Sequence, residues 1–262
     1  MRNLIFANIT RLKKSKIFWA GVIVSMGYSA FLLIMNYLEA TTSPDTEIVH
    51  LNWFFLSALS VAAIFCPVFS GLFVGTEYSD GTIRNKLIAG HKRSSIYLAN
   101  GIVIFIAEYM VFLMASLVVI IMGGPLFGFD LEYPLYFALD ILGGTLMLCA
   151  FASVFTFISM VVSNKASSVA ACLIVYALLF GMANFLRIAV FSYYGEVPSS
   201  VILNEALRSV LEFLYDFTPT GQSLQLTNGL LLHPNRFLLY AIINIVLTTI
   251  GGLAIFKRKN LK

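Results

Sequence analysis

One ionisable side chain lies in the middle of an apolar run of this sequence. Glu108 lies near the middle of the segment Tyr97–Met122. A charge at the centre of a bilayer costs on the order of 2.5–3.5 kcal/mol, so we expect this carboxyl to be protonated, paired or facing water. Candidate partners are Asn100, Asn184 and Arg187, with Arg187 expected at a different depth. Two interpretations stay open: hydrogen bonding within a helix bundle, or a place on a translocation path.

Familiar catalytic chemistries find no support in the sequence. The pattern G-x-x-x-x-G-K-[ST] does not occur, so we do not expect this chain to hydrolyse ATP. The three histidines fall in or beside separate loops without an H-E-x-x-H pattern, which disfavours an intramembrane enzyme. Cys66, Cys149 and Cys172 lie inside apolar runs and are interpreted as small packing residues. We predict no metal site, no cofactor on this chain and no nucleic-acid partner.

A compact polar stretch separates the second and third apolar runs. Residues Gly75–Ile96 read GTEYSDGTIRNKLIAGHKRSSI. Gly81 can break the chain between two helical pieces, because glycine tolerates turn geometry. Asp80 is a candidate cap for a short helix over Thr82–Leu87. The mixture of acidic, basic and apolar residues favours a working element, with a plain connecting loop as the alternative.

The composition indicates which elements must position these residues. The chain is 59% apolar and 11% charged, with a mean hydropathy of +0.88, whereas a soluble domain is about half apolar and about a quarter charged. A helix needs about 20 apolar residues to cross a bilayer. Six segments qualify, which predicts a single all-α, polytopic membrane domain. They are Ile17–Tyr37, Trp53–Val74, Tyr97–Met122, Tyr136–Val161, Val169–Phe191 and Phe237–Phe256.

Lysine and arginine are distributed unequally between the two sides of such a bundle. Fourteen lie on the side of the two chain ends, against Arg187, Arg208 and Arg236 on the other. The positive-inside rule therefore predicts that both termini are cytoplasmic.

Two flanking segments carry helical patterns of their own. Ile5, Ile9 and Leu12 recur at helical spacing among basic residues, which predicts a short interfacial helix; a basic tail is the alternative. In the external segment 192–235, an apolar stripe predicts an amphipathic helix that rests on the outer interface or dips into the outer leaflet beside the last span. The stripe consists of Leu203, Leu207, Val210, Leu211 and Leu214, with a start at Pro198 and a stop at Pro219 and Gly221.

Gly71 and Gly75 stand four residues apart in the second apolar run. Small residues at this spacing are typical of closely packed membrane helices. We therefore expect another helix to approach this pair.

Taken in order, these features resemble the membrane subunits of type-two ABC exporters. The resemblance rests on the stretch Gly75–Leu87, in which an acidic residue precedes Gly81-Thr82 and a short helix, and on Phe217–Gln222 after the external helix. An N-terminal interfacial helix, six spans and a re-entrant helical segment before the last span complete the similarity, which covers essentially the whole chain.

The resemblance implies a permease driven by two copies of a separate ATPase subunit, which binds the ATP and Mg²⁺. It also implies a second permease copy, identical or related, in a bacterial plasma membrane. Glu77, Thr82, Arg84 and Lys86 would make polar contacts with the ATPase, while Ile83 and Leu87 would anchor it. The full implied coupling set is Glu77, Asp80, Gly81, Thr82, Ile83, Arg84, Lys86 and Leu87.

The implied cargo is amphipathic or apolar: a peptide such as a bacteriocin or toxin, an antibiotic, or a lipid-linked compound. The competing hypothesis is a secondary transporter or channel driven by an ion gradient. That class usually shows several intramembrane ionisable residues and internal repeats. Here Glu108 is the one convincing mid-membrane charge, and no repeat is evident.

Overall fold

The computed structural model describes residues 1–42, 50–129, 133–193, 205–229 and 231–259. Within these ranges every regular element is helical, and six helices are long and apolar enough to cross a membrane. The elements are α1 (Arg2–Lys13), α2 (Lys16–Thr42), α3 (Leu51–Ser79), α4 (Thr82–Ile88), α5 (Arg93–Val118), the π-helical turn η1 (Val119–Gly123), α6 (Gly124–Phe127), α7 (Pro134–Val161), α8 (Lys165–Tyr193), α9 (Glu205–Phe217), α10 (Pro219–Asn228) and α11 (Pro234–Arg258).

All six predicted spans are confirmed, each a few residues longer than its apolar run. The third continues from α5 through η1 and α6 as far as Phe127. The second extends furthest into polar sequence, because α3 ends at Ser79 and not near Val74. Its last turn therefore carries Glu77, which is central to the site described below.

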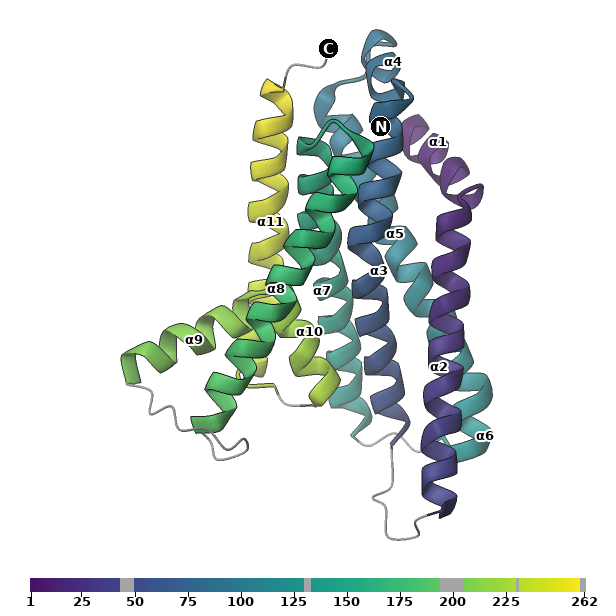
Figure 1. The fold of residues 1–262 in the computed structure, drawn as a ribbon, viewed down its shortest axis with the longest axis vertical. Helices are drawn as coiled ribbons and strands as arrows, with labels where there is room; N and C mark the ends of the chain where they lie inside the picture. The colour runs from purple at the N-terminus through teal and green to yellow at the C-terminus, as the bar shows by residue number, and fades with distance from the viewer. Residues whose placement is uncertain (43–49, 130–132, 194–204, 230, 260–262) are drawn as a thin grey trace.

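The long helices stand side by side, with both chain ends at one end of the bundle (Figure 1). We call this the termini end. Helices α1 and α4 and the C-terminal end of α11 also lie there, while α9 and α10 lie toward the opposite end of the bundle, the far end. Helix α3 is central, since it packs against α2, α5, α7, α8 and α10. The predicted N-terminal helix is confirmed as α1. The chain breaks near Ser15, and α2 then runs at an angle to α1.

The close approach predicted at Gly71 and Gly75 is confirmed and involves α8. A Cβ atom at Gly71 would lie 2.9 Å from the Cα of Val169, and one at Gly75 would lie 2.9 Å from the Cα of Lys165. Real Cβ contacts are not that short, so only glycine permits this backbone-to-backbone packing. The first turn of α8 is thereby seated on the terminal third of α3.

The far end corrects the sequence prediction for segment 192–235. The predicted start at Pro198 and the first stripe position, Leu203, lie outside the described residues. Helix α9 ends at Phe217, but Pro219 then opens a second helix, α10, and Gly221 lies inside it. Proline suits a first helical position because its missing N–H has no partner there. Thr218 caps this helix by accepting a hydrogen bond from the Gly221 N–H.

Candidate functional site: the Glu77 cluster under helix α4

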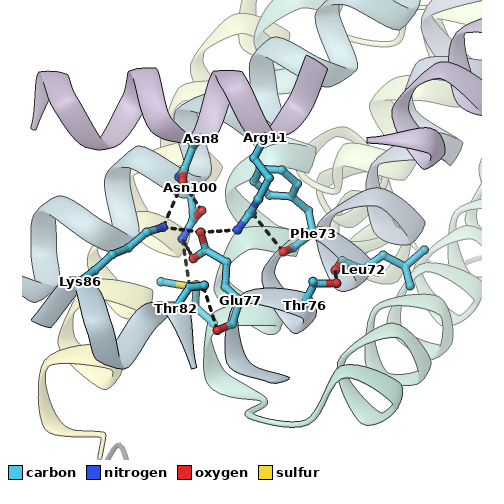
Figure 2. Close-up of polar contacts among 10 residues, drawn as sticks. Asn8, Arg11, Leu72, Phe73, Thr76, Glu77, Thr82, Lys86 and Asn100 are labelled. Carbon is cyan, nitrogen blue, oxygen red and sulfur yellow. Dashed lines mark hydrogen bonds and ion pairs between the residues drawn. The ribbon is translucent and has the colours of Figure 1, made fainter. Parts of the chain in front are cut away.

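A buried carboxylate joins four helices at the termini end. The Glu77 side chain, in the last turn of α3, accepts hydrogen bonds from Arg11 Nη1 of α1 and from Lys86 Nζ of α4 (Figure 2). Its second oxygen accepts a bond from Asn100 Nδ2 of α5 at 2.9 Å. Glu77 is 1% exposed. One side chain thus ties α1, α4 and α5 to the end of α3.

Amide side chains complete the network. Asn8 Nδ2 donates to Asn100 Oδ1 at 2.8 Å, and Asn8 Oδ1 accepts from Lys86 Nζ at 3.0 Å. Asn8 and Asn100 are both buried. Buried polar groups with satisfied hydrogen bonds fix a single arrangement of the elements that carry them. We call the five residues Asn8, Arg11, Glu77, Lys86 and Asn100 the Glu77 cluster.

Arg11 makes further contacts with α3. Its Nη2 donates to the Phe73 carbonyl oxygen at 3.1 Å, and its guanidinium carbon lies 3.5 Å from the centroid of the Phe73 ring, a cation–π contact. Burial lowers the pKa of Arg11 and of Lys86, and the Glu77 carboxylate opposes both shifts. With two cations on one carboxylate, the cluster keeps a positive charge.

Gly81, and not the predicted Asp80, occupies the N-cap position of α4. Gly81 occupies the N-cap position with φ +66°, a left-handed conformation that favours glycine. Asp80 is exposed and ends α3; the prediction that its side chain caps α4 is therefore wrong. Thr82 Oγ1 instead donates to the Glu77 carbonyl oxygen at 3.0 Å, which holds the start of α4 against α3.

Helix α4 has an inward and an outward face. Ile83 is 2% exposed and Leu87 packs against the core, so these expected anchors face into the chain together with Lys86. The outward face consists of Arg84, Asn85 and Ile88; Ile88 is 76% exposed.

This division changes how the predicted coupling residues can act. Glu77, Ile83 and Lys86 position α4 and offer little surface to a partner, whereas Arg84 lies outside as expected. Ile88 was missed by the sequence analysis. The available signal was spacing: Ile88 follows Arg84 by four residues, and such residues share a helix face.

Glu108 is fully buried among α3, α5 and α7, with the Cys66 and Cys149 thiols as neighbours. Among the described residues, no nitrogen or oxygen donor reaches either carboxylate oxygen.

None of the predicted partners of Glu108 is paired with it. Asn100 donates to Glu77, Asn184 donates to the Phe180 carbonyl oxygen at 2.9 Å, and Arg187 lies near Tyr215. The sequence thus located a buried carboxyl correctly, but none of its three candidate partners bonds to it, and Asn100 makes its buried polar contact with Glu77 instead.

Comparison with known proteins bears on the same region. The family model described as ABC-2 family transporter protein matches residues 4–184. The matched segment runs from α1 into α8 and contains the whole Glu77 cluster. Among curated proteins, none matches the sequence.

Proposed function

The chain belongs to the ABC-2 transporter family, and on that premise we propose that it is the permease subunit of an ATP-driven exporter. Membership supports a membrane component of a transporter and not an enzyme in its own right. ATP and Mg²⁺ would be held by a separate ATPase subunit. Two ATPase copies and a second permease, identical or related, would complete the transporter.

The outward face of α4 is the observation that carries this proposal. Ile88 is about three-quarters exposed on a seven-residue helix, beside the cation Arg84. A large apolar side chain on such a projecting element is suited to insertion into a pocket of another protein. We assign Arg84, Asn85 and Ile88 as the surface that contacts the ATPase.

The inward face supports transmission of movement. The Glu77 cluster joins α4 to α1, α3 and α5, and α3 runs as one helix from Ser79 to Leu51 with Pro67 inside it. A displacement of α4 would therefore move the end of α3 with it, as a rigid body. Rigid-body motion of packed helices is an established way to alternate between two states. In this transporter it would open the pathway to each side in turn.

The distribution of basic residues supports an orientation with the termini end in the cytoplasm. Arg11, Lys86, Arg93 and Lys259 lie at the termini end, near the ends of α1, α4, α5 and α11. By the positive-inside rule this end faces the cytoplasm, where ATP is available. We place the chain in a bacterial plasma membrane. An amphipathic peptide, an antibiotic or a lipid-linked compound is the cargo class that we propose.

The experiment is to purify the chain together with the ABC ATPase that we expect a neighbouring gene to encode, and to measure their association and ATP hydrolysis. We expect Ile88→Asp and Arg84→Glu each to weaken association by about tenfold while membrane insertion is kept. Arg258→Glu is the matched control, because Arg258 is an exposed cation at the same end on α11. Unchanged association of both α4 variants would refute the assignment.

Glu108 supports a second candidate function, an ion-gradient-driven transporter. A buried carboxyl whose oxygens lack nitrogen and oxygen donors among the described residues could exchange a proton during transport. Vesicles containing the chain alone, with an imposed pH gradient, distinguish the two. Cargo movement that is abolished by Glu108→Gln and needs no ATPase would favour this candidate.

A further inference from the structure

A pocket at the junction of α1 and α2 has the chemistry of a phospholipid site. It has a volume of about 290 Å³ and lies against α3 at the termini end. That volume is near the lower end for small-molecule sites, so it suits a headgroup and not a whole lipid. We call it the elbow pocket; Arg11, Lys14 and Lys16 form its charged rim, and Ile17, Phe69 and Phe73 its apolar wall.

The charge of the elbow pocket selects for an anion. Three of its lining residues are cations and none is acidic. Glu77 and Asp80 are the acids that interact with Arg11, and Glu77 is already shared with Lys86. Lys14 and Lys16 are both exposed at the rim. A phosphate in the pocket would therefore meet uncompensated positive charge.

The apolar wall selects for a lipid over a free anion. Phe65, Phe69 and Phe73 stack along one side of α3, with ring centroids 5.1 and 5.0 Å apart. Because they are spaced by four residues, this column leads away from the pocket along the helix. Phe69 and Phe73 are themselves buried, but Ile17 lines the pocket from α2 and is 37% exposed. An acyl chain would lie against the exposed side of Ile17 while its phosphate occupies the pocket.

The position of Trp19 indicates that the elbow pocket lies at the depth of the lipid headgroups. Trp19 is 49% exposed, and its Nε1–H donates to the Lys13 carbonyl oxygen at 2.9 Å. Tryptophan is enriched where a membrane meets water, at the level of the lipid headgroups. We propose that the elbow pocket binds the phosphate of an anionic phospholipid of the leaflet at the termini end. The proposal requires only that the chain spans a membrane and does not depend on the ATPase partner.

Native mass spectrometry of the purified chain tests the site. Delipidated protein is titrated with phosphatidylglycerol or with phosphatidylcholine of the same acyl chains. We expect phosphatidylglycerol to be retained preferentially, and the double variant Lys14→Gln/Lys16→Gln to weaken it by about 25-fold, since each basic contact with anionic lipid contributes about fivefold. The variant Lys14→Arg/Lys16→Arg should keep binding, and millimolar inorganic phosphate should not displace the lipid.

The matched control is Arg2→Gln/Lys13→Gln, which removes the same charge from α1 outside the pocket lining. If it weakens phosphatidylglycerol binding as much as the pocket variant does, the attraction is general and the proposal is wrong. Equal retention of phosphatidylcholine would also overturn it, and displacement by inorganic phosphate would show an anion site without a lipid. Loss of binding in the arginine variant would likewise contradict the proposed charge recognition.

Discussion

Replacing Glu77 by glutamine removes the one negative charge on which the junction of α1, α3, α4 and α5 is built. The amide can still accept a hydrogen bond from Asn100, so the shape of the site is kept while its charge is lost. Arg11 and Lys86 are then left against a neutral group and against each other. The change therefore tests the charge pairing with little change of volume.

The magnitude follows from the exposure of the three side chains. Removing one partner of a fully buried ion pair costs about 3–5 kcal/mol. The Glu77 side chain is 0% exposed and that of Lys86 16%, but that of Arg11 is 31% exposed and can be hydrated in part. We therefore expect a loss of about 2–4 kcal/mol. For a chain of this size that lowers the thermal midpoint by about 4–16 °C.

The assay is a double-mutant cycle read by thermal unfolding of the purified chain in one detergent. Lys86→Gln removes one of the two stranded cations, so Glu77→Gln/Lys86→Gln should be more stable than the sum of the two single losses implies. We expect a coupling energy of at least about 1 kcal/mol. Asp80→Asn is the control, because Asp80 is an exposed acid in the same hairpin and should change stability by less than about 0.5 kcal/mol.

Two results would refute the reasoning. One is a Glu77→Gln variant as stable as the unmodified chain, since the buried carboxylate would then contribute nothing. The other is strict additivity of the two single variants, which would show that Glu77 and Lys86 do not interact.

The remaining predictions concern packing, pH and the far end, each measured by thermal unfolding. Gly71→Ala should cost about 1–3 kcal/mol, because its Cβ would meet the α8 backbone; Gly251→Ala, with open space around it, should be neutral or stabilising by up to about 1 kcal/mol. Burial lowers the pKa of Lys259 from 10.5 to about 8. Between those values the unfolded chain binds more protons than the folded one, so this contribution to stability rises with pH. The free energy of unfolding of the unmodified chain minus that of Lys259→Gln should therefore rise from pH 7.5 to 9.5, with exposed Lys257→Gln as control. A difference that does not change with pH would contradict this prediction. Asp216→Ala should cost about 1–3 kcal/mol, because it strands the buried α10 amide that donates to it at 3.0 Å; no loss would show that this bond is unimportant.

The spans were predictable because their signal is local and long. About 20 consecutive apolar residues leave little choice of structure, and the structure only lengthened each run. The Gly71 and Gly75 pair was predictable for a similar reason, since a spacing of four on one helix needs no knowledge of the partner. The identity of that partner, the first turn of α8, was not encoded nearby.

The interior of the site was not predictable, because its contacts join distant segments. Arg11 and Glu77 are separated by 66 positions, and Asn8 and Asn100 by 92. Nothing near Glu77 in the sequence shows that α3 continues past its apolar run and turns this carboxylate inward. A carboxylate beside a charged loop suggests a surface contact; only the packing of α1 and α5 over it makes it a buried one.

The outward surface of α4 depends on the buried residues beneath it. A helix of seven residues is too short to be stable in water by itself, and α4 has no side-chain cap. Its orientation must come from tertiary contacts: Ile83 in the core, Lys86 on Glu77, and the Thr82 hydroxyl on the end of α3. A buried ion pair is a weak source of net stability, but it can select one packing arrangement among several. Rotating α4 by half a turn would bury Arg84 and expose Ile83, and it would leave the Glu77 carboxylate without Lys86. The cluster therefore determines that Arg84 and Ile88 face outward, so residues that never touch a partner would set the surface that a partner binds.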